Sequence, residues 1–220
     1  SERLLGAIVG MHGDDYGLIM PPKIAPIQVV VIPIVKKEGG EDVLLAAKNL
    51  VNELRTSGLR VKIDDRDLRP GNKYYDWEIK GVPLRLEIGA RDLEKGNTFS
   101  AKRTGGKEPI PLSDAVNHVE RLLEEVADEL RNRSKLHSED VIDQLPAFEQ
   151  IDGVWKMNGE VEEGKIYQMA FDGSDSHAEI IERATGLTFL GDATESYPEE
   201  IPCHMSGVPT NRRVILAKTY

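Results

Sequence analysis

The sequence predicts an α/β fold with a mixed sheet over residues 25–133, followed by a small α+β domain over residues 134–220. Three observations predict this class. A run of mostly β-branched residues at 27–34 precedes an amphipathic helical pattern at 41–56, and a further apolar run follows at 59–63. This order of strand, helix and strand implies a right-handed crossover between parallel strands.

The first three elements have distinct signatures. The run at 27–34 is almost continuously apolar, which is typical of a strand buried on both faces. The helical pattern at 41–56 places its apolar residues on one face, and Ser57-Gly58 supplies its end. The second strand, at 59–63, is expected directly after that stop.

Turn and strand signals are dense between residues 69 and 96. Pro70-Gly71 predicts one turn and Gly81-Val82-Pro83 another, because proline cannot continue a helix or a ladder and glycine tolerates conformations that other residues avoid. The run at 84–88 then alternates apolar and charged residues, so we expect a strand with one face toward a core.

Charged residues mark this strand and its carboxyl end. Arg85 and Glu87 alternate with the apolar residues and therefore share the opposite face. Arg91-Asp92 predicts a charged turn after the strand, at the edge where open α/β sheets usually place binding residues. Periodicity alone leaves two interpretations open: a binding surface, or a solvated face with one ion pair.

The remaining elements follow from shorter patterns. In the first domain these are a strand at 98–103, a hairpin-like turn at 104–107 and a helix that Ser113 caps and that ends near Asn132. A polar link at 132–140 leads to the last domain. There the patterns indicate mixed helix and loop at 141–151, short strands at 155–161 and 165–171, a helix at 178–184 and a final strand at 213–217.

The composition argues against some classes of protein. A net charge of −10 opposes a general nucleic-acid binder, which needs a basic surface, but leaves room for a local basic patch. The single cysteine, Cys203, fits a reducing compartment. The sequence has no run of about eighteen or more apolar residues and no apolar leader before residue 30, so we expect a soluble, cytoplasmic protein.

Three stretches carry a family resemblance. The runs RPGNKYYDWE and KGVPLRLEIGARDLEKG resemble the anticodon-binding domain of prolyl-tRNA synthetases of the archaeal and eukaryotic type. The opening SERLLGAIVGMHGDDYGLIMPPKIAPIQVVVIPI is similar to the end of their class II catalytic domain, including its third motif, and looks like a domain whose start is missing. The closing RRVILAKTY is similar to their C-terminal extension.

The resemblance implies three parts. Residues 1–24 would be the tail of the catalytic domain, residues 25–133 a class IIa anticodon-binding domain with a five-stranded mixed sheet, and residues 134–220 a C-terminal extension of the zinc type. The complete enzyme would activate proline with ATP and Mg²⁺, attach it to tRNA(Pro) and form a homodimer through its catalytic domain. This part alone is expected not to charge tRNA, and Tyr220 is expected to pack on the catalytic domain.

At the active site, the resemblance implies a role for two residues of the opening stretch. Arg3 would be the motif-three arginine that holds the ATP γ-phosphate, a task that suits a planar cation with several donors. Gly6, which is small, would let the backbone approach the nucleotide.

In the anticodon-binding domain, the resemblance assigns guanine reading to Glu78, Arg85, Arg91 and Asp92, and a phosphate contact to Lys80. The chemistry agrees, because carboxylates accept from guanine N1 and N2 while arginine donates to O6 and N7. Unpaired anticodon bases expose these edges. A lysine on phosphate positions the RNA without specifying its sequence.

Two departures from the family pattern stand out. Ala90 occupies a position where the family commonly has proline. Four positions that often carry zinc-binding cysteines hold Asp172, His177, Cys203 and Ser206 instead. Serine is a poor zinc ligand, whereas the other three remain competent. A zinc site and a metal-free scaffold held by packing both stay open.

Two rival interpretations stand beside the synthetase. A free-standing anticodon-domain relative, acting as a non-catalytic RNA-binding or partner-binding module, agrees with the acidic charge but not with the motif-three remnant before Pro21. A flavodoxin-like nucleotide binder agrees with the strand, helix, strand order. It would need a glycine-rich phosphate loop after the strand at 27–34, where only Gly39-Gly40 occurs.

Overall fold

The computed structural model describes residues 2–35 and 40–219, so the expectations that concern Gly39 and Tyr220 lie outside the described residues. The chain divides into two compact units, Ser1–Ser134 and Lys135–Tyr220. None of the described helices combines the length and the apolar character needed to cross a membrane.

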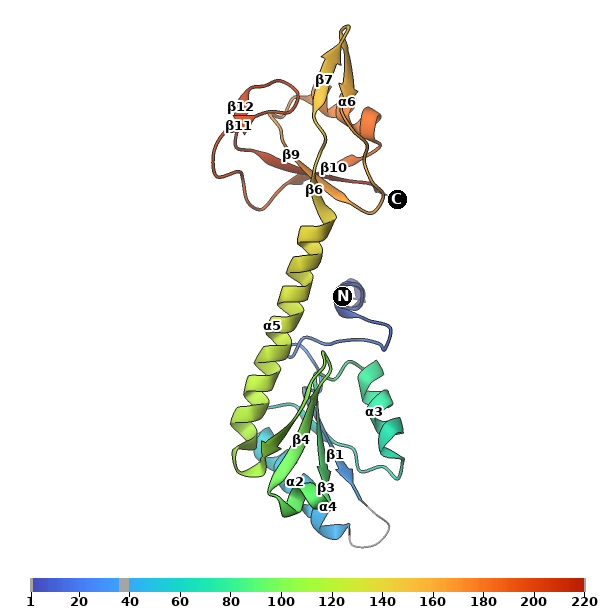
Figure 1. Ribbon diagram of the computed structural model, residues 1–220, viewed down its shortest axis with the longest axis vertical. Helices are drawn as coiled ribbons and strands as arrows, with labels where there is room; N and C mark the ends of the chain where they lie inside the picture. Colours follow the sequence, from blue (N-terminus) through green and yellow to red (C-terminus); the bar gives the residue numbers. More distant parts are fainter. Residues whose placement is uncertain (1, 36–39, 220) are drawn as a thin grey trace. The chain divides into compact units, whose positions relative to one another are not determined.

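The first unit is built on a five-stranded mixed sheet with the order β2-β1-β3-β4-β5 (Figure 1). Its strands are β1 (Val29–Ile34), β2 (Val61–Ile63), β3 (Leu84–Gly89), β4 (Asn97–Lys102) and β5 (Lys107–Pro111). β1 pairs in parallel with β2 and β3, whereas the β3–β4 and β4–β5 pairs are antiparallel. The predicted mixed α/β sheet is confirmed.

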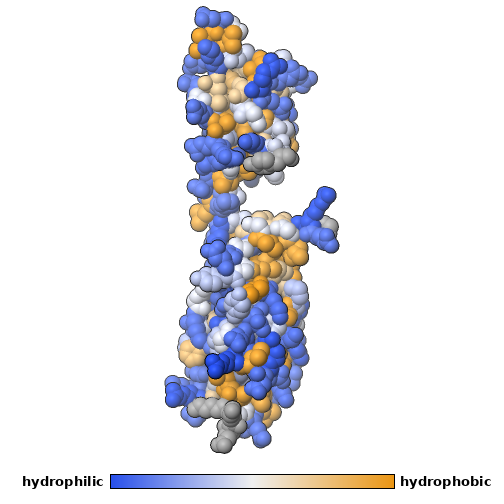
Figure 2. Space-filling view, turned by 90° about the vertical axis from the view of Figure 1, so that its right-hand side faces the viewer, coloured by the Kyte–Doolittle hydropathy of each residue, from blue (hydrophilic) through white to orange (hydrophobic). Residues whose placement is uncertain are grey.

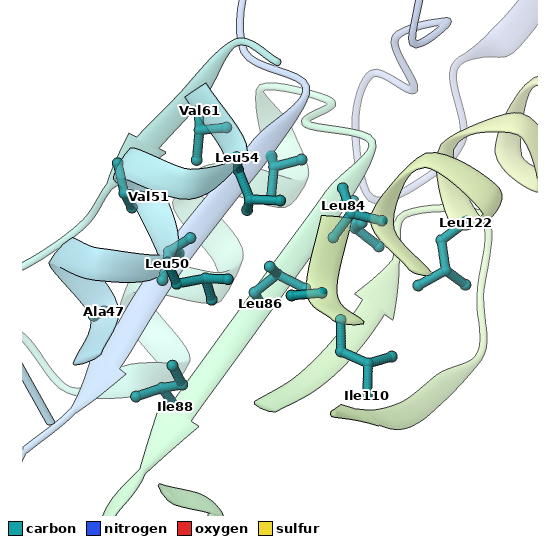
Figure 3. Packing of buried hydrophobic residues seen from close by; sticks show 14 of the residues in the cluster. Ala47, Leu50, Val51, Leu54, Val61, Leu84, Leu86, Ile88, Ile110 and Leu122 are labelled. Carbon is teal, nitrogen blue, oxygen red and sulfur yellow. The ribbon is translucent and has the colours of Figure 1, made fainter. Parts of the chain in front are cut away.

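One face of this sheet carries the main core of the unit. It is covered by α2 (Glu41–Thr56) and by α5 (Ala115–Val141). Figure 3 shows Leu50 and Leu54 of α2 near Leu84 and Leu86 of β3, and all four side chains are buried. Burying a leucine contributes about 1.5–3 kcal/mol, so this layer accounts for much of the stability of the unit. α2 has the bounds that the amphipathic pattern predicts.

The opposite face of the sheet is covered by α3 (Pro70–Ile79). Trp77 packs there on Val30 and Ile32, which point away from α2 because side chains alternate along β1. The predicted turn at Pro70-Gly71 is wrong. Pro70 is the first residue of the helix, where its missing N–H leaves no hydrogen bond unmade.

A buried carboxylate holds α3 in place. Asp64 is 2% exposed and accepts hydrogen bonds from Trp77 Nε1 at 2.7 Å and from Arg66 Nε at 2.8 Å. Lys73 Nζ donates to the Asp64 carbonyl at 3.1 Å. Burial would raise the pKa of Asp64, but the hydrogen bonds from Arg66 and Trp77 outweigh it and lower the pKa to about 2. Asp64 is therefore ionised and fixes the inner side of the helix.

α1 (Glu2–His12) turns its apolar side chains outward. Leu4, Leu5, Val9 and Met11 are 67%, 53%, 50% and 61% exposed, and no residue of this helix is buried by the described part of the chain. Figure 2 shows apolar surface beside the N-terminal end of the chain. The helix therefore adds nothing to the core of the first unit.

α5 is longer than its pattern predicts. It follows a 3₁₀ turn at Leu112–Asp114, so Ser113 lies in that turn instead of capping the helix. The helix continues to Val141, whereas the sequence predicted an end near Asn132. Residues 133–141 contain neither glycine nor proline, and Lys135 and Glu139 form an i,i+4 pair at 3.8 Å. The predicted polar link is thus helical.

The second unit contains a four-stranded sheet with the order β10-β13-β9-β6 and two small hairpins. Its elements are β6 (Ile142–Gln144), β7 (Phe148–Ile151), β8 (Val154–Met157), β9 (Ile166–Ala170), α6 (Asp175–Thr185), β10 (Thr188–Asp192), β11 (Ile201–Pro202), β12 (Pro209–Thr210) and β13 (Arg213–Ala217). Met169, Ile181 and Leu216 form its fully buried centre. The final strand has its predicted bounds, while the expected mixture of helix and loop at 141–151 is mainly β6 and β7.

Candidate nucleic-acid interface

A cavity of about 280 Å³ opens in the first unit, where the C-terminal end of α3, the amino end of β3 and the β4–β5 turn meet. This volume is near the lower limit for pockets that hold small ligands, so it suits one ring system and not a whole nucleotide. Charged and aromatic side chains line the cavity together. The lining residues are Tyr16, Val30, Trp77, Glu78, Val82, Arg85, Ala101, Lys102, Arg103 and Gly105.

Two predicted site residues, Glu78 and Arg85, meet at the wall of this cavity. Arg85 Nη1 donates to Glu78 Oε1 at 2.9 Å, and Arg85 Nε donates to Glu87 Oε1 at 3.1 Å. Lys107 Nζ reaches the other oxygen of Glu87 at 2.7 Å, and the Arg85 guanidinium lies 4.0 Å from the centre of the Tyr74 ring. The side chains of Arg85 and Glu87 are only 16% and 6% exposed, so this is no solvated strand face.

The electrostatics of this cluster keep it ionised. Burial would raise the pKa of Glu87, but Lys107 and Arg85 outweigh burial and hold the pKa below its ordinary value. The pKa of Tyr74 is raised, chiefly by burial and then by the Glu87 charge, so Tyr74 keeps its proton. The Glu78 side chain is 39% exposed and can accept from a ligand. The hydrogen bonds of Arg85 to described residues use Nη1 and Nε, which leaves Nη2 for a ligand.

Lys80 lies next to the cavity at the end of α3. Its Nζ is 4.7 Å from the centre of the Trp77 ring, and Lys62 Nζ is 5.4 Å from the same ring. Trp77 itself lines the cavity. Lys80 is exposed, so it can reach a phosphate near a base that occupies the cavity.

Arg91 and Asp92 lie at the other end of β3. They belong to the short helix α4 (Ala90–Glu94), which replaces the predicted charged turn. Asp92 Oδ2 accepts from the Gly89 backbone N–H at 3.2 Å, so the carboxylate caps the helix, and Arg91 is exposed. About 13 Å of strand separates Arg85 from Gly89. Among the described residues, no hydrogen bond joins Arg91 or Asp92 to Glu78 or Arg85, which we call the cavity pair.

Arg3 and Gly6 lie on α1, and Arg3 is exposed. A Cβ added at Gly6 would meet no atom within 4 Å in the described part of the chain. The structure therefore leaves this side of the helix open, and across the described residues no three His, Cys, Asp or Glu side chains are grouped to hold a metal ion.

Three residues that sequence reasoning missed complete the cavity: Tyr16, Lys102 and Arg103. Lys102 and Arg103 precede the Gly105-Gly106 turn, and a cluster of cations beside a glycine turn is the signal that could have found them. Tyr16 stands in the HGDDYG stretch, where Asp14 lies 89 residues before its partner Arg103. No local pattern reveals that contact.

Two of the four positions of the expected zinc site, Asp172 and Ser206, are hydrogen-bonded to each other in the second unit. Asp172 accepts hydrogen bonds from the Ser206 hydroxyl and from Ser174 N, and the Cys203 thiol lies beside it. The Ser206 hydrogen bond is the main cause of a lowered Asp172 pKa. Across the described ranges, no three His, Cys, Asp or Glu side chains are grouped to hold a metal. With a serine as fourth member and both Asp172 oxygens already bonded, this set does not fit a closed zinc site.

Comparison with known proteins agrees with this geometry. The anticodon binding domain family matches residues 28–132, which contain the cavity pair. The proline–tRNA ligase of Methanocorpusculum labreanum is 38% identical over 223 residues, covering 100% of this chain and 45% of that protein. The enzyme of the same name from Thermococcus kodakarensis is 42% identical over 157 residues, covering 71% of this chain and 33% of that protein.

A solved structure shows the same fold. Giardia lamblia prolyl-tRNA synthetase, in complex with prolyl-adenylate, matches with a TM-score of 0.81 and 28% identity, covering 99% of this chain and 48% of that chain. The chain thus spans less than half the length of these relatives. Because the likeness extends along the whole chain in sequence and in fold, the chain belongs to the archaeal-type prolyl-tRNA synthetase family and corresponds to the C-terminal half of its members.

Proposed function

We propose that this chain is the tRNA-reading part of a proline–tRNA ligase, which activates proline with ATP and Mg²⁺ and attaches it to tRNA(Pro). Its likeness to proline–tRNA ligases from end to end supports this role and does not favour a free-standing binding module. Residues 25–133 would read the anticodon, residues 1–24 would close the catalytic domain, and residues 134–220 would form the C-terminal extension. Such an enzyme works in the cytoplasm, where tRNA is charged.

Base reading is assigned to the cavity pair, and this pair is the observation that carries the proposal. Glu78 offers a carboxylate oxygen to the N1 and N2 donors of a guanine, while Arg85 offers Nη2 to its acceptors. Glu87 and Tyr74 hold the Arg85 guanidinium from behind, so the donor is fixed before RNA arrives. Lys80 would hold a neighbouring phosphate. Arg91 and Asp92 lie outside the cavity and would contribute less to base choice.

The active-site roles are proposed from family membership. Arg3 would bind the ATP γ-phosphate beside the open backbone at Gly6, and the exposed apolar side of α1 would pack within the catalytic domain of a homodimer. Arg3 supplies positive charge and donors there, while proline and Mg²⁺ would be held by other residues of the complete enzyme.

The test is tRNA binding by the full chain at one fixed salt concentration, because phosphate contacts make affinity salt-dependent. A tRNA with the proline anticodon is compared with one in which both guanines are changed. Wild type should prefer the first, and Arg85→Ala should lose about 1–3 kcal/mol for this tRNA alone. Arg91→Ala is the matched control, an arginine near the same strand that lies outside the cavity. Equal affinity of the wild-type chain for both tRNAs would rule out base reading here.

A further inference from the structure

The segment 13–20, which lies outside the matched anticodon domain, is fixed against the C-terminal end of α3. Leu18 N donates to the Ile79 carbonyl at 3.3 Å, and Met20 N donates to the Gly81 carbonyl at 3.0 Å. The two backbones touch so closely that a Cβ on Gly17 would lie 2.7 Å from Ile79 Cα, and a Cβ on Gly81 would lie 2.6 Å from the Leu18 carbonyl oxygen. The segment therefore has a defined place at the end of the helix that carries Glu78.

A second set of contacts shapes the turn at Asp14–Gly17. These residues exchange backbone hydrogen bonds at 3.0 Å, and Asp14 Oδ1 accepts from Tyr16 N at 2.9 Å. Arg103 donates to both Asp14 oxygens, at 2.5 Å and 2.9 Å, and its Nε donates to the Glu78 carbonyl at 3.1 Å. The Arg103 side chain is 6% exposed and that of Asp14 is 28% exposed, so the guanidinium is buried while the carboxylate still meets solvent. The hydrogen bonds from Arg103 hold the pKa of Asp14 below its ordinary value.

This turn places an aromatic ring at the mouth of the cavity. Tyr16 lines the cavity with Glu78 and Arg85, yet the residue is 71% exposed. A tyrosine that contributes so little to packing has its ring free for a ligand. The edge of a base would face the charged pair, and a base in that position needs a surface for its face.

We propose that Tyr16 stacks on the nucleobase that Glu78 and Arg85 read, and that the Arg103–Asp14 ion pair holds the ring in place; the proposal rests on the function proposed above. The anticodon reader would then include a residue that precedes the anticodon domain in the chain. Single-stranded bases commonly stack on aromatic side chains, and this contact tolerates any base, so Tyr16 would add affinity while Glu78 and Arg85 choose the base.

The proposal is tested with the full chain and tRNA carrying the proline anticodon. Tyr16→Ala should weaken binding about tenfold, the equivalent of about 1.4 kcal/mol, while Tyr16→Phe, which keeps the ring, should stay within about twofold of wild type. Tyr16→Leu should behave like alanine, because it keeps apolar bulk without an aromatic face. Tyr75→Ala is the matched control, since Tyr75 is also an exposed tyrosine of this unit and does not line the cavity.

A fluorescent base separates stacking from a loss of structure. With thienoguanosine, a fluorescent analogue that keeps O6, N1–H and the N2 amino group, replacing each anticodon guanosine in turn, saturating wild-type chain should change the emission of one of the two labels, and saturating Tyr16→Ala should not. Wild-type affinity in Tyr16→Ala, or equal loss in Tyr16→Phe and Tyr16→Ala, would overturn the stacking role. If Arg85→Ala still loses the anticodon preference in that case, base reading by the cavity stands without Tyr16. If neither variant affects binding, the proposed function itself fails.

Discussion

The two ends of β3 carry the same kinds of side chain and use them differently. At the amino end, Arg85 lies between Glu78 and Glu87 under the cover of α3, and a cavity opens in front of them. At the carboxyl end, Asp92 caps a five-residue helix and Arg91 points into solvent. Charged residues in the sequence are therefore not enough to make a binding site. A site also needs neighbouring side chains that fix the charged group and a cavity that encloses it.

The pairing of β3 with an antiparallel strand explains why the usual rule for α/β sheets does not locate the cavity. Open α/β sheets usually bind ligands at the carboxyl ends of their parallel strands. Here β3 also pairs with the antiparallel strand β4, whose turn brings Lys102 and Arg103 back to the amino end of β3. The mixed sheet thus gathers cations at the end where a purely parallel sheet has none of its usual binding loops.

The largest effect on stability is expected from replacing Asp64, the carboxylate that holds α3 at the amino end of β3. Asp64→Asn removes the buried charge that accepts from Trp77 and from the half-exposed Arg66, and places an amide donor opposite these donors, which should cost about 3 kcal/mol of unfolding free energy. Urea unfolding measures this in a Trp155→Phe background, which leaves Trp77 as the only tryptophan of the chain. Asp65→Asn, at the exposed neighbouring position, is the control and should change little. An equally stable Asp64→Asn chain would break the claim that this carboxylate holds α3.

A somewhat smaller loss of unfolding free energy is expected when Asp64 is protonated at low pH. The folded-state pKa of Asp64, about 2, lies below the ordinary value of 3.8, so its stabilisation is complete above pH 4 and is lost as the pH falls through this window. The loss should be roughly 2 kcal/mol between about pH 4 and pH 2. Unfolding free energies measured across this range should fall less steeply for Asp64→Asn than for wild type and Asp65→Asn. Parallel curves for all three chains would contradict the assignment.

The smallest effect is expected at the carboxyl end of β3. Asp92→Ala removes the hydrogen bond to Gly89 N and a favourable charge at the start of α4, which should cost about 1 kcal/mol of stability. The preference for the proline anticodon should stay as in wild type. Arg91→Ala shows the effect of removing a charge from the same helix without touching its cap. If Asp92→Ala lost anticodon preference as Arg85→Ala is expected to, both ends of β3 would take part in base reading. The claimed difference between the two ends would then be wrong.

Local pattern was enough for the elements whose partners are near in sequence or whose period is regular. The bounds of α2 follow from its apolar stripe and the stop at Ser57-Gly58, and the buried face of β3 follows from its alternation. α3 was missed because Pro70-Gly71 looks like a turn and its few buried residues, Lys73 and Trp77, form no stripe. The end of α5 was placed too early because its last turns are polar and depend on backbone propensity instead of packing.

The candidate site was less predictable than the sheet. Glu78 and Arg85 entered through a family resemblance, and alternation alone could place Arg85 only beside Glu87. The contact of Arg103 with Asp14 spans 89 residues, so no periodicity contains it. The same limit applied to the expected zinc positions, where the sequence did not reveal the hydrogen bond between Ser206 and Asp172.

The pairing of cations around the cavity has a thermodynamic consequence. The cations that line it are already balanced by carboxylates of the chain: Arg85 by Glu78 and Glu87, Lys102 by Glu125 and Glu129, and Arg103 by Asp14. A protein cation releases counterions from RNA when it neutralises a phosphate, and each such contact adds about 0.7 to the slope of log affinity against log salt for single strands. Internally balanced cations add little to that slope. For the proposed base reader, in a chain with a net charge of −10, we therefore expect the preference for a matching base to depend less on salt than the binding of RNA in general does.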